Sequence, residues 1–173
     1  MSVDVGDYRT AMSRLATGVT VVTTRSRGQH ELMTANAVMS VSLEPTLLAV
    51  SVGETSRWLP AVLDRGSFVV NVLSGEHADL ARWCADQARH DRPGDLLGHE
   101  ARLTSAGLLL LPGALATLEC HVYADHPAGD HRLVIGEVDA VGVSAAEQPL
   151  VFFDRAFTTA LAAIPRLQKV ASS

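Results

Sequence analysis

The pattern of hydrophobic and polar positions along this chain predicts short strands more often than helices. Residues 19–24 are β-branched throughout, which favours an extended strand. Residues 67–73 alternate apolar and polar side chains well enough for a strand with one buried face. We therefore expect strands over 19–24, 31–42, 46–52, 67–73, 115–124, 131–143 and 150–153.

Turns and a few helices complete the predicted framework. A turn over 25–29 indicates that the next strand returns antiparallel, and a turn over 126–130 makes the strands on either side of it a hairpin. Gly136 predicts a bulge or a close approach of another group. We expect helices over 7–16, over 57–63 with Ser56 as its N-cap, from Ser74 to about residue 87, and in an Ala-rich tail over 158–173. The predicted fold is mainly β, a closed or nearly closed antiparallel barrel with a few short peripheral helices.

Composition and charge narrow the class of protein. With 173 residues, of which 47% are hydrophobic and 19% charged, the chain is expected to form one globular domain. A net charge of −5 argues against a nucleic acid or an anionic membrane as partner. We expect no signal peptide and no membrane span, because the most apolar stretch is interrupted at Pro112 and Gly113. Cys84 and Cys120 are interpreted as buried thiols in a reducing cytoplasm rather than as a disulfide.

Residues 33–57 carry the candidate chemistry. Small residues, hydroxyls and the amide of Asn36 stand where a plain strand has Val, Ile or Leu on alternate positions. Small side chains allow a flat ligand to lie close to the backbone. Thr55, Ser56 and Arg57 then open a predicted helix, whose free backbone N–H groups favour an anion. A flat surface followed by an anion site is the outline of a flavin nucleotide.

A set of short motifs extends this interpretation to most of the chain. They lie at 18–24, 33–45, 68–74, 118–120 (Leu-Glu-Cys), 129–131 (Gly-Asp-His), 135–138 (Ile-Gly-Glu-Val) and 149–153 (Pro-Leu-Val-Phe-Phe). In this order and spacing, they resemble the flavin reductase domain family, the FMN-binding split-barrel reductases that supply reduced flavin to two-component monooxygenases. The resemblance spans about residues 8–157 and leaves 158–173 as a helical or flexible tail.

The resemblance implies a Greek-key split barrel that forms a homodimer, with flavin held near the subunit interface. It implies an NAD(P)H-dependent flavin reductase, in which hydride passes from the nicotinamide to the flavin and the reduced flavin leaves for a monooxygenase partner. The polar, arginine-containing loop over 89–96 favours FAD over FMN, and NADH is preferred to NADPH. No metal is expected.

The resemblance also places the site residues. Hydride transfer to a flavin depends on stacking and alignment, so no acid–base residue is assigned, although His131 is a candidate. The nicotinamide nucleotide is expected against His131 and Phe153. The flavin is expected against Met33, Thr34, Ala35, Asn36, Ala37, Val38, Ser40, Ser51, Thr55, Ser56, Arg57 and Arg89.

Each assignment has a simpler structural alternative. The polar residues over 34–37 also suit an edge strand with a solvated face, and Ser56 also suits simple helix capping. His131 also suits an exposed turn, and Phe153 is slightly favoured as a core residue. Asn71 is interpreted as structural, with a partner if it is buried. Arg82, Arg89 and Arg92 suit either an adenosine pyrophosphate or a solvated basic face, and His121 suits a half-exposed strand position better than a ligand.

Three functions remain open at this point. The first is a reductase that releases reduced flavin. The second is an oxidoreductase of the same barrel that retains its flavin and reduces another acceptor. The third is a flavin- or haem-binding carrier or sensor without turnover.

Overall fold

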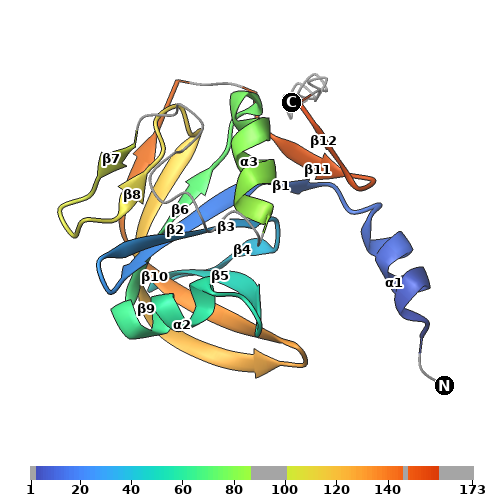
Figure 1. Ribbon diagram of the computed structural model, residues 1–173, viewed down its shortest axis with the longest axis horizontal. Coiled ribbons are helices and arrows are strands. Elements are labelled where there is room, and N and C mark those ends of the chain that lie inside the picture. The colour runs from blue at the N-terminus through green and yellow to red at the C-terminus, as the bar shows by residue number, and fades with distance from the viewer. Residues whose placement is uncertain (1–2, 87–100, 146–147, 160–173) are drawn as a thin grey trace, which may run out of the picture.

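Seven antiparallel strands form the central sheet in the computed structural model, which describes residues 3–86, 101–145 and 148–159 (Figure 1). The strand order is β3-β2-β6-β9-β10-β5-β4, and every neighbouring pair is antiparallel. The strands are β2 (Thr20–Ser26), β3 (Gln29–Ala35), β4 (Val38–Leu43), β5 (Thr46–Gly53), β6 (Ser67–Val72), β9 (Ala116–Ala128) and β10 (His131–Val143).

The two edge strands of this sheet, β3 and β4, are consecutive in the chain. The three peptide steps from Ala35 to Val38 cover at most about 11 Å, so the sheet has to curl until its edges approach each other. Within the described residues β3 and β4 do not pair with each other, and the barrel is therefore split between them. The predicted mainly β, antiparallel split barrel is confirmed.

The predicted strand over 31–42 is two strands rather than one. It breaks at Asn36 and Ala37, where the chain leaves β3, which pairs with β2, and enters β4, which pairs with β5. Periodicity did not reveal the break, because neither residue is a Gly or a Pro and only the barrel closure requires the crossing. Asn36 and Ala37 are both exposed at this crossing.

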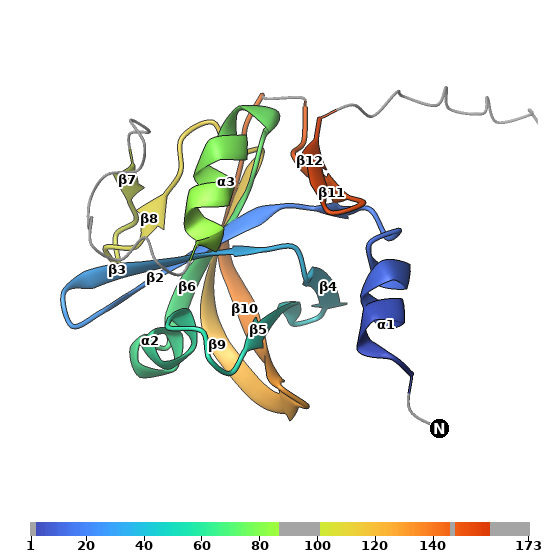
Figure 2. The same ribbon diagram turned by 45° about the vertical axis from the view of Figure 1, so that its right-hand side comes forward.

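Short elements cover the barrel. Helix α2 contacts β2, β3 and β6, and helix α3 packs on β3 and β2 (Figure 2). The helices are α1 (Val5–Met12), α2 (Trp58–Arg65), the 3₁₀ turn η1 (Gly75–His77) and α3 (Ala78–Ala85). Two small sheets join β1 (Thr17–Gly18), β11 (Val151–Phe153) and β12 (Ala156–Thr158), and β7 (Arg102–Leu103) with β8 (Leu109–Leu110).

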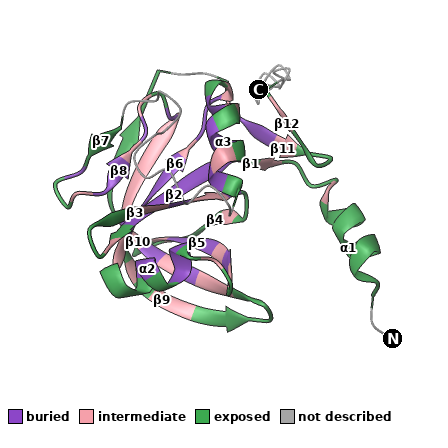
Figure 3. Ribbon diagram, viewed as in Figure 1, coloured by how far each residue is buried: buried purple, intermediate pink, exposed green. Residues whose placement is uncertain are grey.

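Strand β2 is buried on both faces, which explains its unbroken β-branched sequence (Figure 3). Val22 belongs to a core cluster inside the barrel that contains Phe68 and Trp58. Val21 points the other way, into a second cluster that includes Leu80 of α3. The barrel core and the layer under α3 therefore share this strand.

Helix α1 projects from the barrel in both views (Figures 1 and 2). Asp4 caps it, with an oxygen that accepts from the Gly6 backbone at 2.7 Å. None of its residues is buried, and the predicted apolar face at Tyr8 and Met12 is exposed. An eight-residue helix is marginal by itself in water, so this apolar face calls for a surface to pack on.

Neither predicted serine cap forms a side-chain bond to a helix N–H. Arg57, not Ser56, occupies the N-cap position of α2 and makes no side-chain cap, while the hydroxyl of Ser56 donates to the sulfur of Met33 at 3.2 Å. Ser74 does occupy the N-cap position of η1, where the helix predicted from Ser74 begins, but its hydroxyl pairs with Nδ1 of the buried His77 at 2.8 Å rather than with backbone. In each case another side chain replaces the backbone partner.

The expectations for Gly136 and Asn71 are confirmed. The β9–β10 register shifts between Ile135 and Gly136, and a Cβ built on Gly136 would lie 2.4 Å from Cζ of Phe68. The fully buried Asn71 is structural: its amide donates to the Val21 carbonyl at 3.1 Å and its oxygen accepts from the Leu111 N–H at 2.9 Å. This side chain ties β2 to the segment that precedes β9.

Cys84 and Cys120 are buried free thiols, as expected. Burial raises the pKa of the Cys120 thiol to about 12, with Asp139 and Glu119 adding to the shift. No described helix is long and apolar enough to cross a membrane. The predicted helical tail and the polar loop over 89–98, including Arg89 and Arg92, lie outside the described residues, and the one-domain boundaries stay a prediction.

Candidate functional site

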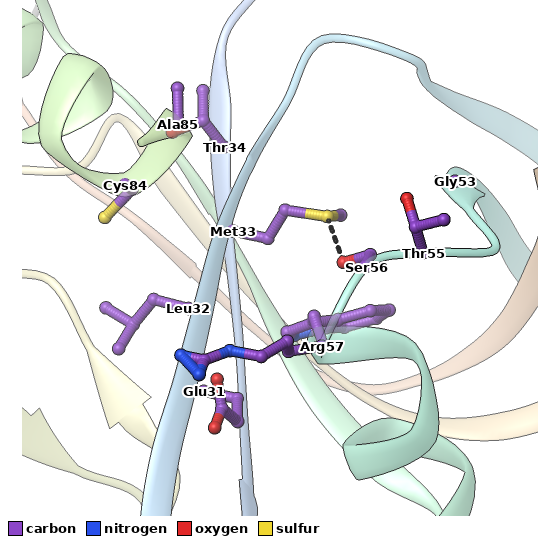
Figure 4. Close-up of a pocket in the computed structure, with 11 residues that line it drawn as sticks. Glu31, Leu32, Met33, Thr34, Gly53, Thr55, Ser56, Arg57, Cys84 and Ala85 are labelled. Atoms are coloured by element: carbon purple, nitrogen blue, oxygen red, sulfur yellow. Dashed lines mark hydrogen bonds between the residues drawn. The ribbon is translucent and has the colours of Figure 1, made fainter. Parts of the chain in front are cut away.

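A cavity of about 550 Å³ opens between β3, the start of α2 and the end of α3 (Figure 4). Its volume lies within the usual range for small-molecule sites. The β3 wall consists of Glu31, Leu32, Met33 and Thr34. The opposite walls consist of Gly53, Thr55, Ser56, Arg57 and Trp58 on one side and Cys84 and Ala85 on the other.

The β3 wall is held by side chains that face its neighbours. The hydroxyl of Thr34 donates to the Ala81 carbonyl of α3 at 2.7 Å, so this side chain joins strand to helix. Leu32 belongs to the core cluster under α3, and Met33 packs against the cluster inside the barrel. Because successive side chains of β3 pack on opposite sides of the strand, these contacts fix its position in the cavity wall.

The opposite wall is set by a tight turn after β5. The Ser56 N–H donates to the Gly53 carbonyl at 2.9 Å, which reverses the chain before α2 begins. Figure 4 shows Ser56 and Met33 meeting across the cavity through their O–H···S contact. Sulfur is a weak acceptor, so little free energy is lost when the Ser56 hydroxyl leaves it and donates to a stronger acceptor.

Two charged side chains line the cavity, Glu31 and Arg57. Neither has a hydrogen bond or ion pair with another residue in the described part of the chain. The helix that follows Arg57 has no side-chain cap. In its first turn the Leu59 N–H already donates to the Ser56 carbonyl at 3.3 Å and Pro60 has no N–H, so the guanidinium of Arg57 is the main feature at this end that suits a phosphate.

Trp58 also lines the cavity, and its ring belongs to the barrel core against Phe68. Its Nε1 is buried and has no hydrogen-bond partner among the described residues. The donors of this cavity therefore fit an anionic, oxygen-rich ligand with an apolar body, as a flavin nucleotide is.

The structure gathers part of the predicted flavin set around this cavity. Met33 and Thr34 face Thr55, Ser56 and Arg57, from segments about twenty residues apart in the chain. The other predicted residues lie elsewhere. Ala35 is buried, and its carbonyl accepts a hydrogen bond from the Thr20 hydroxyl. Asn36 and Ala37 are exposed at the crossing, and the half-buried Ser51 donates its N–H to the Ala37 carbonyl. Val38 and Ser40 line a separate groove.

That separate groove has a volume of about 450 Å³ and is mostly apolar. It lies over β4, β5 and the middle of β10, reaches Val70, Val72 and Leu118, and shares no lining residue with the first cavity. Met39, Leu43 and Val141 line it and remain largely exposed in the chain. Val38 and Ser40 therefore do not line the same cavity as Met33 and Thr34, and the assignment of residues 33–40 to one flavin surface stays a prediction.

His131 lies at the rim of the first cavity. It pairs with Gly53 across the β10–β5 ladder, and its Nε2 is 3.9 Å from a Cβ built on Gly53. Its Nδ1 bonds the Asp130 carboxylate at 2.7 Å, and this hydrogen bond lowers the pKa of Asp130. The histidine is half exposed and its ring stands where a second ligand could enter.

Phe153 is not a core residue, so the preference for core filling is wrong. It is 41% exposed in the β11–β12 hairpin and does not line the cavity, while Phe152 packs inward and meets Phe157 at 5.6 Å between ring centres. Arg82 pairs with Asp79 at 2.7 Å and lies over the Phe157 ring, which favours the structural alternative for that arginine. His121 is half exposed and bonds Asp139, as its strand position suggested.

Sequence reasoning missed six residues of the cavity. Trp58 follows Arg57 directly, so an extension of the anion motif by one residue would have found it. The other five carry no local pattern that points to a ligand. Two of them, Cys84 and Ala85, lie in the last turn of α3, which reaches the cavity only through its packing on β3. The six are Glu31, Leu32, Gly53, Trp58, Cys84 and Ala85.

Comparison with known proteins decides the family. The family model described as the flavin reductase like domain matches residues 12–161, most of the chain. The chain belongs to this family. The resemblance seen in the sequence motifs is thereby confirmed.

Relatives of this flavin reductase chain include enzymes with named partners. It is 43% identical to the NADH-dependent FMN reductase AsuE2 of Streptomyces nodosus subsp. asukaensis, covering 88% of this chain and 83% of that protein. It is 36% identical to the reductase component of 4-hydroxyphenylacetate 3-monooxygenase of Thermus thermophilus, covering 87% and 93%.

Solved structures agree with the fold. The flavin reductase PheA2 is 36% identical and superposes with a TM-score of 0.82 over 92% of this chain and 100% of that one. The NADH:FAD oxidoreductase SgcE6 of Streptomyces globisporus, solved with NAD and FAD fragments, is 29% identical with a TM-score of 0.82 over 97% and 99%. The SgcE6 structure holds NAD and FAD fragments on the same architecture.

Proposed function

We propose that this protein is an NADH-dependent flavin reductase whose flavin binds in the cavity between β3 and the start of α2. The observation that carries the assignment is the meeting of Met33 and Thr34 with Thr55, Ser56 and Arg57 around one cavity. The first pair was predicted for a flat ring and the second group for a phosphate. Relatives that are NADH-dependent flavin reductases support the reaction.

The residues of this chain bind and orient rather than exchange protons. Arg57 and the Thr55 hydroxyl hold the phosphate, and Ser56 exchanges its weak bond to Met33 for a bond to a phosphate oxygen. The exposed amide of Asn36, which has no partner among the described residues, is free to bond the polar edge of the ring. Bound flavin supplies the chemistry by accepting a hydride from the nicotinamide.

The nicotinamide nucleotide enters beside His131, next to Gly53 at the cavity rim. The Asp130 carboxylate holds the imidazole ring in place at 2.7 Å. His131 therefore acts by position, as a surface against which the nucleotide lies. The contact between Phe153 and the nicotinamide stays a prediction. It requires the Phe153 ring to reach the site from the exposed β11–β12 hairpin.

A second copy of the chain fits the apolar groove over β4, β5 and β10. Met39, Leu43 and Val141 expose apolar surface there, and such patches are uncommon on monomers. The apolar face of α1 has no cover within the described residues of its own chain. We propose a symmetric homodimer in which these surfaces are covered reciprocally.

We further propose that reduced flavin leaves for a flavin-dependent monooxygenase in the cytoplasm. Relatives that are reductase components of monooxygenases support this partner. The weak Ser56–Met33 bond suits reversible flavin binding, because the Ser56 hydroxyl regains the Met33 sulfur as its acceptor when the flavin leaves. Two buried free thiols suit a reducing compartment.

The decisive test is NADH oxidation by the purified protein with FAD or FMN, with and without oxygen. A releasing reductase consumes NADH only with flavin, and free reduced flavin accumulates only under anaerobic conditions. Flavin that co-purifies and stays bound through gel filtration after reduction would favour the retaining oxidoreductase. Tight flavin or haem binding without NADH oxidation would favour the carrier or sensor and contradict the proposal.

A further inference from the structure

One end of the cavity carries two opposite charges that do not neutralise each other. The carboxylate of Glu31 and the guanidinium of Arg57 both line it, and neither has an ion pair or hydrogen bond within the described residues. Figure 4 shows the Arg57 side chain extending from the start of α2 toward Leu32 and Glu31 on β3. A phosphate drawn to Arg57 therefore meets a carboxylate at the same end.

Glu31 is free of any structural task in the described chain. It pairs with Thr24 in the β2–β3 ladder through backbone only, and strand alternation places it opposite to the buried Leu32. Its half-buried side chain lines the cavity. Its position indicates a role toward a ligand.

The two flavin nucleotides differ at this end. FMN terminates in a phosphate monoester, which carries about −1.5 to −2 charge near neutral pH. In FAD the two phosphates are joined by an anhydride bond, each carries a single charge, and the chain continues to a ribose with two adjacent hydroxyls. Carboxylates accept hydrogen bonds from such ribose hydroxyls. Relatives of both kinds exist, an FMN reductase and an NADH:FAD oxidoreductase, so the choice has to come from this chain's own residues.

We propose that Glu31 makes this site prefer FAD to FMN. The inference rests on the proposed flavin site. Arg57 attracts the phosphate of either flavin, while Glu31 repels the terminal phosphate of FMN and accepts hydrogen bonds from the adenosine ribose of FAD. Glu31 is thus a specificity residue rather than a catalytic one.

Flavin dissociation constants of the wild type and Glu31→Gln, measured by quenching of flavin fluorescence, test this role. Removal of the charge is expected to tighten FMN binding about three- to tenfold, the effect of one unit charge several ångströms away in a partly aqueous site. For FAD the relief of charge repulsion at its two phosphates is offset by the loss of the hydrogen bonds from the adenosine ribose, so FAD affinity is expected to change less than FMN affinity and the preference for FAD narrows. Glu76→Gln, an exposed residue of η1 outside the cavity, removes the same charge and is expected to leave both constants unchanged.

Measurement of the same dissociation constants at high salt is the second test. At about 1 M salt the screening length falls to about 3 Å, so the wild-type preference is expected to approach that of Glu31→Gln. An equal change for both flavins, or no change, in Glu31→Gln would overturn the role of Glu31. Binding of neither flavin by the wild type would instead overturn the proposed function, so the two failures are distinct.

Discussion

The hydroxyl of Ser56 donates to the sulfur of Met33 over 3.2 Å, across the cavity assigned to the flavin. This contact joins the two walls that the proposed function requires, from β3 and from the turn before α2. Because sulfur accepts weakly, the bond keeps the Ser56 hydroxyl satisfied without committing it. Under the proposed function, a phosphate oxygen replaces the Met33 sulfur as the acceptor of the Ser56 hydroxyl.

Ser56→Ala is expected to weaken flavin binding about tenfold or more, because a hydrogen bond to a charged acceptor contributes about 1.5–3 kcal/mol. Stability changes little, since only a weak O–H···S bond is lost. Flavin titration and urea unfolding measure the two effects. Ser13→Ala, which removes an exposed hydroxyl bonded to the Thr10 carbonyl, is the matched control. Unchanged flavin affinity in Ser56→Ala would place the phosphate elsewhere.

Gly136→Ala is expected to destabilise the fold by about 1–3 kcal/mol through overpacking. The added Cβ would lie 2.4 Å from Cζ of Phe68 and 3.0 Å from Cβ of Cys120, inside the barrel core. Thermal and urea unfolding measure the loss. Gly18→Ala serves as the control because nothing lies within 4 Å of its added Cβ. Phe68→Leu in the Gly136→Ala background should restore part of the stability; full stability of Gly136→Ala alone would contradict the close approach.

His121 is expected to make stability depend on pH. The hydrogen bond with Asp139, at 2.9 Å, raises the pKa of His121 above its ordinary value of 6.5, with charge attraction from Asp139 and Glu137 adding to it. A raised folded pKa gives stability that is fully present below 6.5 and is lost as pH rises through the folded value.

The contribution of Asp139 is therefore expected to be larger below the unfolded pKa of His121 than well above the folded one. The free energy of unfolding of Asp139→Asn, compared with wild type at about pH 5.5 and about pH 8, checks the sign. In a His121→Gln background the same substitution should show no such difference. A larger loss at the higher pH would contradict the assignment.

Leu43→Asp is expected to convert the proposed homodimer to a monomer. Leu43 is 86% exposed, lines the apolar groove and lies on edge strand β4. A charge buried at a symmetric interface enters twice, so the effect on association is doubled. Sedimentation velocity measures the state. Leu63→Asp, at a position of α2 outside the groove that is 40% exposed, is the control. A wild type that sediments as a monomer would contradict the dimer.

Local signals in this chain predicted elements well and their ends less well. The β-branched run of β2 and the Gly129–Asp130 turn between β9 and β10 depend on neighbouring residues, so periodicity revealed them. The side-chain caps failed because the hydroxyl of Ser56 bonds the distant Met33 and the hydroxyl of Ser74 bonds the side chain of His77, three residues on. A capping rule considers only bonds to backbone N–H groups and has no access to such competing side chains.

The candidate site divides along the same line. The small residues at 33–37 and the Thr-Ser-Arg run at 55–57 have local chemistry that indicates a flat ligand and an anion, so the sequence by itself determined the class of ligand and the family. Only the tertiary structure decided that Met33 and Thr34 share a cavity with Arg57 while Val38 and Ser40 face another groove. The physical reason is the curl of the sheet: it joins edges β3 and β4 through Asn36 and Ala37, and this long-range closure reverses which face each residue presents.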